Sequence, residues 1–236
     1  MPPAIPRCFA LVPCAGVGAR SGAALPKQYV PLAGRAMVAH TLAALQAVPR
    51  LAATLVVLAP DDTLFDTSVP GFVDARGWVA RCGGATRAAS VTNGLAELAA
   101  RGADAGDWVL VHDAARCLLR PAWVDRLIDA CWHDDIGGLL ALPLADTLKQ
   151  AANGARVAAT LPRGDKWAAQ TPQMFRLGPL RRALADAGDA VTDEASAIEH
   201  LGHAPLLVPG SLENFKVTNP DDFDLAQRLL GSPATS

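Results

Sequence analysis

Residues 8–28 read CFALVPCAGVGARSGAALPKQ, an apolar run followed by a glycine-rich loop. The apolar run predicts a strand that is covered on both faces of a sheet. Gly16 and Gly18 have no side chain, so the backbone N–H groups beside them can approach phosphate oxygens. Arg20 supplies a planar fork of donors for phosphate, and Lys27 supplies a compact, mobile charge. The segment therefore predicts a phosphate-binding loop at the end of a buried strand.

Two familiar nucleotide-binding loops do not fit this segment. A Walker A loop needs Gly-Lys followed by Ser or Thr at the start of a helix, and that sequence is missing. In a dinucleotide fingerprint the third glycine would come one position before Gly22. No acidic residue ends the second predicted strand, which reads Leu58-Ala59-Pro60. A nicotinamide-dependent oxidoreductase is therefore disfavoured, while a non-catalytic nucleotide-binding module remains an alternative.

Composition and charge predict a cytoplasmic protein. Hydrophobic residues make up 51% of the 236 residues, yet no apolar run is long enough to cross a bilayer or to act as a signal peptide. A formal net charge of −2 gives no electrostatic basis for binding nucleic acid or a membrane surface. The five cysteines include no Cys-x-x-Cys pair, which favours free thiols over disulfides or a zinc site.

Strand-like and helix-like segments alternate along most of the chain. After the first strand, further strands are expected at 55–58, 78–80, 108–112 and 137–142, and helices at 36–48, at 86–101 and from Pro121 onward. Strands that are apolar throughout, separated by helices, are typical of an α/β fold. The sequence therefore predicts a mostly parallel, doubly wound sheet.

The pattern changes after about residue 144. Two short segments at 146–149 and 156–160 flank Asn153-Gly154, which predicts a β-hairpin with few large apolar residues. Such an arm needs a partner to pack against, because an isolated hairpin is marginally stable in water. Beyond the hairpin, helices are expected near 177–187 and 193–202, strands at 205–208 and 214–218, and a last helix capped by Asn219 with Pro220 at its first position.

Two later clusters could complete a ligand site beside the first loop. Gly83-Gly84 opens a helix, where the bare backbone could read a flat base and the Ser90 hydroxyl could assist; the alternative is a simple helix cap by Thr86. His112-Asp113-Ala114-Ala115-Arg116 follows a buried strand, at the edge where open α/β sheets bind ligands. Asp113 could hold a hydroxyl or a magnesium ion, and Arg116 could hold a phosphate or anchor Asp113. A structural ion pair is the alternative, and His112 is expected to be structural.

Other candidate residues have ordinary structural explanations when each is taken alone. Arg163 would be a solvated charge, and Thr171-Pro172 would form a turn. Thr192-Asp193-Glu194 would cap a helix and place acids in its first turn. Lys216 lies inside a predicted apolar strand, where a buried ammonium must reach an anion or point to solvent.

Taken in order, these motifs resemble the 2-C-methyl-D-erythritol 4-phosphate cytidylyltransferase family of the non-mevalonate isoprenoid pathway. The resemblance extends from about residue 9 to residue 229. It rests on Pro13-Cys14-Ala15-Gly16-Val17-Gly18-Ala19-Arg20, Pro26-Lys27-Gln28-Tyr29, His112-Asp113-Ala114-Ala115-Arg116, Asp146-Thr147-Leu148-Lys149, Gln170-Thr171-Pro172-Gln173, Thr192-Asp193-Glu194-Ala195-Ser196 and Lys216-Val217-Thr218.

The resemblance implies a Rossmann-like nucleotidyltransferase fold in a single domain over residues 7–231, with an arm at about 144–166 that forms a homodimer. It implies transfer of a cytidylyl group from CTP to 2-C-methyl-D-erythritol 4-phosphate, giving 4-diphosphocytidyl-2-C-methyl-D-erythritol and pyrophosphate. Magnesium or another divalent cation would be held mainly by the CTP phosphates, with Asp113 as a possible ligand. A ribitol 5-phosphate cytidylyltransferase is the alternative.

The resemblance also implies a role for each matching residue. CTP would be bound by Pro13, Cys14, Ala15, Gly16, Gly18, Lys27, Gly84, Ala85, Ser90 and Ala114. The alditol phosphate would be bound by Asp113, Arg116, Thr171, Thr192 and Lys216, with Thr147 and Arg163 reaching in from the partner's arm. The catalytic residues would be Arg20, Lys27, Arg163 and Lys216. Cys14 replaces a usual alanine and Ala85 a common acidic residue, so the cytosine is expected to be read mainly by backbone groups.

Overall fold

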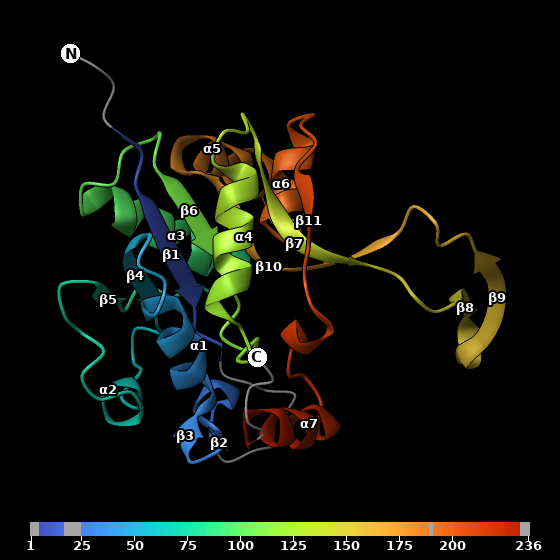
Figure 1. Ribbon diagram of the computed structural model, residues 1–236, viewed down its shortest axis with the longest axis horizontal. Helices are drawn as coiled ribbons and strands as arrows, with labels where there is room; N and C mark the ends of the chain where they lie inside the picture. The colour runs from blue at the N-terminus through green and yellow to red at the C-terminus, as the bar shows by residue number, and fades with distance from the viewer. Residues whose placement is uncertain (1–4, 17–24, 189–190, 232–236) are drawn as a thin grey trace.

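The computed structural model describes residues 5–16, 25–188 and 191–231. A central seven-stranded sheet is covered by helices on both faces (Figure 1). Its strands, in order across the sheet, are β11 (Leu206–Pro209), β7 (Gly137–Pro143), β10 (Trp167–Arg176), β6 (Trp108–Val111), β1 (Cys8–Pro13), β4 (Leu51–Val57) and β5 (Gly77–Ala80). All neighbouring pairs are parallel except those of β10, which runs antiparallel to β6 and β7. The predicted α/β fold with a mostly parallel sheet is confirmed.

Alternate residues of β1 face two separate apolar layers. Ala10 and Val12 pack with α1 (Met37–Gln46) and α4 (Pro121–Cys131) on one face. Phe9 and Leu11 pack on the other face with α3 (Arg87–Ala100), α5 (Leu177–Ala187) and α6 (Glu194–His200). Because both faces of β1 are buried, the strand reads as a continuous apolar run in the sequence. The parallel strands also end at one shared edge, where β1 gives way to the glycine-rich loop.

Smaller elements close the lower part of the molecule in Figure 1. They are the 3-10 turns η1 (Lys27–Tyr29) and η4 (Leu212–Asn214), the strand pair β2 (Pro31–Leu32) and β3 (Arg35–Ala36), and the helices α2 (Phe65–Ser68) and α7 (Pro220–Gly231). Helix α7 packs against β2 around a small apolar cluster that includes Val217 and Ala226. None of the helices in the described ranges is long and apolar enough to span a bilayer. All five cysteines are free thiols.

Two segments differ from the sequence-based expectations. The stretch expected to turn at Thr171-Pro172 is part of β10, whose pairing with β7 is interrupted between Ala169 and Gln173. The Thr171–Pro172 peptide bond is cis. The strand predicted at 214–218 is wrong, because this stretch leaves η4 as irregular chain before α7 begins. In both places polar side chains are buried and hydrogen-bonded, so a search for apolar residues in the sequence does not predict the structure there.

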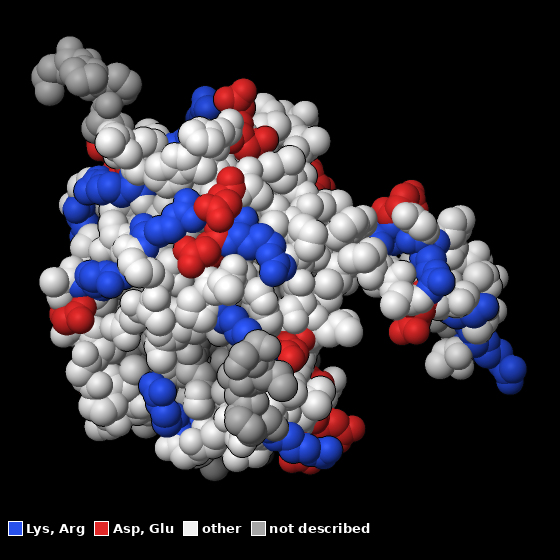
Figure 2. Space-filling view, viewed as in Figure 1, with Lys and Arg blue, Asp and Glu red and all other residues white. Residues whose placement is uncertain are grey.

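The predicted hairpin projects from the body of the molecule (Figure 1). It consists of β8 (Leu148–Ala152) and β9 (Arg156–Leu161), joined by the turn η2 (Asn153–Ala155). Residues 145–169 are exposed along almost their whole length. Figure 2 shows basic side chains along this arm, which carries Lys149, Arg156, Arg163 and Lys166. Within the chain, the arm has no apolar layer of its own.

Candidate active site

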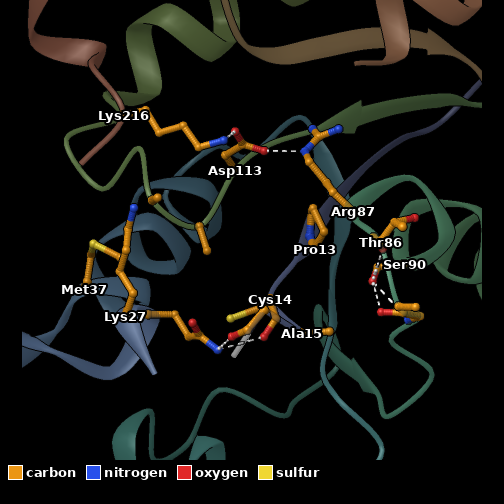
Figure 3. Close-up of a pocket in the computed structure, with 16 residues that line it drawn as sticks. Pro13, Cys14, Ala15, Lys27, Met37, Thr86, Arg87, Ser90, Asp113 and Lys216 are labelled. Carbon is orange, nitrogen blue, oxygen red and sulfur yellow. Dashed lines mark hydrogen bonds and ion pairs between the residues drawn. The ribbon is translucent and has the colours of Figure 1, made fainter. Parts of the chain in front are cut away.

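A cavity of about 550 Å³ opens where β1, β6 and the loop before α3 reach the carboxyl edge of the sheet (Figure 3). Among its lining residues are nine that the family resemblance implied for CTP: Pro13, Cys14, Ala15, Gly16, Lys27, Gly84, Ala85, Ser90 and Ala114. Asp113 and Lys216, expected on the alditol phosphate side, line the same cavity. Gly18 and Arg20 lie outside the described residues. The structure thus brings the predicted nucleotide residues to one place, and their individual roles remain predictions.

Gln28 holds the first part of the glycine-rich loop. Its buried amide nitrogen donates to the carbonyl oxygens of Cys14 at 3.2 Å and Gly16 at 2.9 Å. Because these carbonyl oxygens face Gln28, the backbone at 14–16 has a fixed orientation at the cavity wall. The sequence analysis quoted Gln28 within a motif but gave it no role. The sequence signal for such a role was a polar residue placed between Lys27 and Tyr29.

The second loop is shaped by hydroxyl groups at the start of α3. Thr86 caps the helix by accepting a hydrogen bond from the Ala89 N–H at 3.0 Å, which was the structural alternative in the sequence analysis. The Ser90 hydroxyl accepts from the Gly84 N–H at 3.0 Å and donates to the Thr86 carbonyl at 3.0 Å. A side chain at Gly83 would collide with Ala15 and with the backbone of Leu58, so only glycine allows the two loops to approach this closely.

Two lysines reach the cavity from separate segments. Lys27 comes from η1, and Lys216 comes from the irregular chain that follows η4. Burial lowers the pKa of Lys27, and the ammonium of Lys216 lowers it further. A site that concentrates two ammonium groups is suited to phosphate anions.

Asp113 is held by two cations. Its Oδ2 accepts from Lys216 Nζ at 2.7 Å and its Oδ1 accepts from Arg87 Nε at 2.7 Å (Figure 3). Burial acts to raise the pKa of the Asp113 carboxyl, but Arg87 and Lys216 together hold it well below its usual range. Lys216 therefore reaches an anion, one of the two outcomes that the sequence left open.

Arg116 does not anchor Asp113, contrary to one of the two predicted possibilities. Its Nη1 donates to the Asn214 carbonyl at 2.6 Å, and its Nη2 donates to the Ala169 carbonyl at 3.3 Å. These bonds tie the loop after β6 to η4 and to β10. The guanidinium thus stabilises the backbone on the side of the cavity that carries Lys216, and its expected contact with the alditol phosphate stays a prediction.

His112 is structural, as expected from the sequence. It is completely buried, and burial lowers its pKa to about 4. A neutral ring that donates from Nε2 to the Arg116 carbonyl leaves Nδ1 to accept from the Thr171 hydroxyl at 3.0 Å. Thr171 Oγ1 also accepts from the Asp113 N–H at 3.0 Å. The histidine therefore orients Thr171 and is not a free base.

Five of the seven predicted substrate residues do not line this cavity, namely Arg116, Thr147, Arg163, Thr171 and Thr192. Thr192 lines a neighbouring cavity of about 140 Å³ that shares Thr86 and Arg87 with the larger one. Thr147 and Arg163 are exposed on the arm and line neither cavity of their own chain. Their expected place in a partner's site stays a prediction.

The charged pair Arg87 and Glu194, next to Asp113, had no predicted role in the site. Arg87 donates from Nη1 and Nη2 to the two carboxylate oxygens of Glu194, at 2.7 Å and 3.0 Å. Burial acts to lower the pKa of Arg87, but Glu194 and Asp113 raise it above its usual value. The sequence showed Glu194 as an acid in the first turn of a helix and gave no sign that its side chain points inward.

A model of the family described as IspD, 2-C-methyl-D-erythritol 4-phosphate cytidylyltransferase, matches residues 8–232. The chain belongs to this cytidylyltransferase family. The IspD family consists of nucleotidyltransferases, so the predicted family and class of enzyme are confirmed.

Relatives of the chain include both single and bifunctional proteins. It is 57% identical to the 2-C-methyl-D-erythritol 4-phosphate cytidylyltransferase of Paraburkholderia phymatum, covering 97% of this chain and 98% of that one. It is 65% identical to the bifunctional enzyme IspD/IspF of Albidiferax ferrireducens, where the match covers 95% of this chain and 53% of the relative. The chain thus spans about half the length of that bifunctional IspD relative.

Solved IspD structures share the fold. A crystal structure of a 4-diphosphocytidyl-2C-methyl-D-erythritol synthase matches with a TM-score of 0.84 at 42% identity, covering 95% of this chain and 98% of that one. The Francisella tularensis enzyme matches with a TM-score of 0.80 at 32% identity, covering 94% and 99%. These likenesses confirm the predicted nucleotidyltransferase fold.

Proposed function

We propose that this member of the IspD family transfers the cytidylyl group of CTP to 2-C-methyl-D-erythritol 4-phosphate, giving 4-diphosphocytidyl-2-C-methyl-D-erythritol and pyrophosphate. The observation that carries the proposal is the cavity at the carboxyl edge of the sheet, where a glycine-containing loop faces two lysines and a paired aspartate. The full-length relative from Paraburkholderia phymatum carries the methylerythritol name, which does not favour the ribitol 5-phosphate alternative.

The chemistry asks for positioning and charge neutralisation. A phosphate oxygen of the alditol phosphate attacks the α-phosphorus of CTP and forms a new P–O bond. The bond from the α-phosphorus to the bridging oxygen breaks, and its electron pair leaves with pyrophosphate. A phosphate monoester is anionic at neutral pH, so no strong general base is needed. Holding two polyanions in line at low dielectric is the main task of the protein.

We assign the side chains to this task by their position. The backbone at 13–16 and 18, with Gly84, Ala85, Ser90 and Ala114, would bind CTP. Lys27 and Arg20 would neutralise the triphosphate as pyrophosphate departs. Lys216 and a partner's Arg163 would hold the incoming phosphate, beside Asp113, Arg116, Thr147, Thr171 and Thr192. The support for this assignment is that the described nucleotide residues line one cavity together with both lysines.

Magnesium, or another divalent cation, fits this site as a partner of the triphosphate. Mg²⁺ is commonly held by one or two carboxylates together with substrate phosphates. Asp113 is the one carboxylate among the described residues that line the cavity, and each of its oxygens already accepts one hydrogen bond and retains a lone pair. The described residues include no group of three or more acidic, histidine or cysteine side chains that could hold a metal ion by themselves. A bound cation would offset phosphate charge, and Asp113 is the residue that could contact it.

The arm supports a homodimer. Val157 and Leu161 are exposed on it, and a hairpin of this size is marginal alone. In a two-fold dimer each arm would bring Thr147 and Arg163 to the other chain's cavity. We further propose a cytoplasmic enzyme without nucleic-acid or membrane partners, in line with the near-neutral charge of the chain.

Pyrophosphate release by the purified protein tests the proposed reaction. CTP with 2-C-methyl-D-erythritol 4-phosphate and Mg²⁺ should give robust turnover, while ribitol 5-phosphate should give little. Turnover with ribitol 5-phosphate alone would reverse the assignment. Replacing CTP by UTP tests whether the cytosine is still selected with Ala85 at the base loop; comparable kcat/KM for both nucleotides would show that the usual acid is needed.

A further inference from the structure

Four charged side chains of alternating sign extend from the core of the protein to the cavity. Glu194 pairs with Arg87, Arg87 pairs with Asp113, and Asp113 pairs with Lys216. The first three are largely buried, and Lys216 is the half-exposed end of the series. Arg87 lines both cavities, so it separates the larger cavity from the one beside Thr192.

The inner end of this series is firmly held by its backbone. Glu194 is 1% exposed and is the first residue of α6. Asp193 on one side caps the helix through the Ser196 N–H at 2.9 Å, in a reciprocal capping box. On the other side the Ala195 N–H donates to the Gln173 side chain at 2.8 Å. Glu194 is therefore a fixed anchor, because neighbouring residues restrain the chain on both sides of it.

The guanidinium group of Arg87 takes its orientation from Glu194. It is planar, and its donors form a rigid fork, so two bonds from Nη1 and Nη2 to one carboxylate also set the direction of Nε. In this structure Nε points at Asp113 Oδ1. The other oxygen of Asp113 is then directed at Lys216.

We propose that Glu194 is a positioning residue for the acceptor side of the site, acting through Arg87 to set the carboxylate of Asp113 and the ammonium of Lys216. The inference rests on the proposed function for the identity of the acceptor. Glu194 does not line the larger cavity, so it would act on the acceptor only through Arg87.

Charge balance explains why a carboxylate is needed at this position. Without it, Asp113 alone would neutralise both Arg87 and Lys216, and a buried cation that lacks its own partner is costly. Arg87 would compete with Lys216 for the same carboxylate. Binding of the acceptor phosphate should be weakened most by this change. The CTP loops at 13–16 and at Gly84 are held by Gln28 and Ser90, which do not belong to this series of charges.

Glu194→Gln tests the proposal, because glutamine keeps the shape and removes the charge. We expect the KM for the alditol phosphate to rise about tenfold, the scale of one charge-assisted hydrogen bond, with the KM for CTP changed less than about threefold. Arg87→Lys, which loses the planar fork, should give the same selective effect. The double variant should be about as impaired as either single one, because both changes break one connected unit.

Asp107→Asn provides a matched control at the opposite end of β6. Asp107 is also buried and accepts from Arg7 at 2.7 Å and 3.2 Å. This control should lower Tm and leave both KM values unchanged. An effect of Glu194→Gln on Tm alone, or an equal rise of both KM values, would overturn the proposal.

A readout independent of activity separates this proposal from the proposed function. In a crystal structure of the Glu194→Gln protein, we expect Arg87 to turn towards the Asp113 carboxylate and the contact from Lys216 Nζ to Asp113 Oδ2 to be lost, whereas Asp107→Asn should keep that contact. If Glu194→Gln does not fold, Arg87→Lys replaces it and should displace the Asp113 carboxylate. An unmoved Asp113 would overturn the positioning role. Failure of the proposed function would instead appear as a wild-type protein that releases no pyrophosphate.

Discussion

The cavity and the arm differ in what supports their residues. Around the cavity His112 is 0% exposed and Glu194 is 1% exposed, and each makes hydrogen bonds within the chain. On the arm Val157 is 64% exposed and Leu161 is 37% exposed. The cavity is therefore organised by one chain, whereas the arm has apolar side chains without a cover in that chain. The difference teaches that one chain is enough to organise the cavity, whereas the arm would be covered only in the proposed dimer.

Lys27→Ala should have the largest effect, because Lys27 lies in the part organised by one chain. We expect kcat to fall by about 10²–10³, the scale for losing one preorganised donor to developing charge. Steady-state pyrophosphate release measures this. Lys149→Ala is the matched control on the arm, where Lys149 donates to Thr160 at 2.7 Å, and its kcat should stay near that of the wild type.

A rise in the KM for CTP at unchanged kcat would show that Lys27 supplies uniform binding instead. Equal losses for Lys27→Ala and Lys149→Ala would remove the contrast between the two regions.

Arg163→Ala should have a smaller effect that is confined to the acceptor. Loss of a charge-assisted hydrogen bond is worth about 1.5–3 kcal/mol, so kcat/KM for the alditol phosphate should fall about 10–100-fold. The KM for CTP should remain close to the wild-type value. Arg156→Ala, another exposed arginine on the arm, controls for the loss of basic charge. If both variants behave alike, the arm contributes only general electrostatics.

Burial of His112 beside the cavity should make the free energy of unfolding depend on pH. Burial lowers the pKa of His112 to about 4 in the folded protein, against about 6.5 for an ordinary histidine. Below pH 6.5 the unfolded state therefore binds a proton that the folded state excludes, and stability falls as the pH falls. The contribution amounts to about 2 kcal/mol between pH 7 and pH 5.

Urea unfolding of the wild type and of His112→Asn at both pH values measures this contribution. The variant should lose that part of the pH dependence, and His203→Asn, at an exposed site, should retain it. An unchanged pH dependence in His112→Asn would contradict the assignment of a buried neutral ring.

The sequence predicted the elements whose pattern is set by apolar burial. Strand β1 and strand β6 were predicted because both faces are covered, which makes every residue apolar. The arm was predicted by the opposite signal, a lack of large apolar residues around Asn153-Gly154. The lysines and loops that line the cavity were found because phosphate chemistry restricts the residue types.

Polar burial could not be predicted in the same way. Strand β10 carries Gln170, Thr171 and Gln173, which are buried through hydrogen bonds to distant residues. The inward position of Glu194 could not be predicted either, because its partner Arg87 is 107 positions away in the chain. Such contacts depend on the tertiary fold, and local composition does not encode them.

The most direct test of the contrast between cavity and arm is a mixture of two inactive chains. A Lys27→Ala chain and an Arg163→Ala chain are refolded together and assayed at alditol phosphate concentrations well below KM, with mixed dimers verified by differential tags. If each arm serves the partner's cavity, half of the dimers are mixed and half of their sites are intact, so roughly a quarter of wild-type activity should return. If mixed dimers form and activity stays at the average of the two separate variants, Arg163 acts within its own chain and the account of the arm is contradicted.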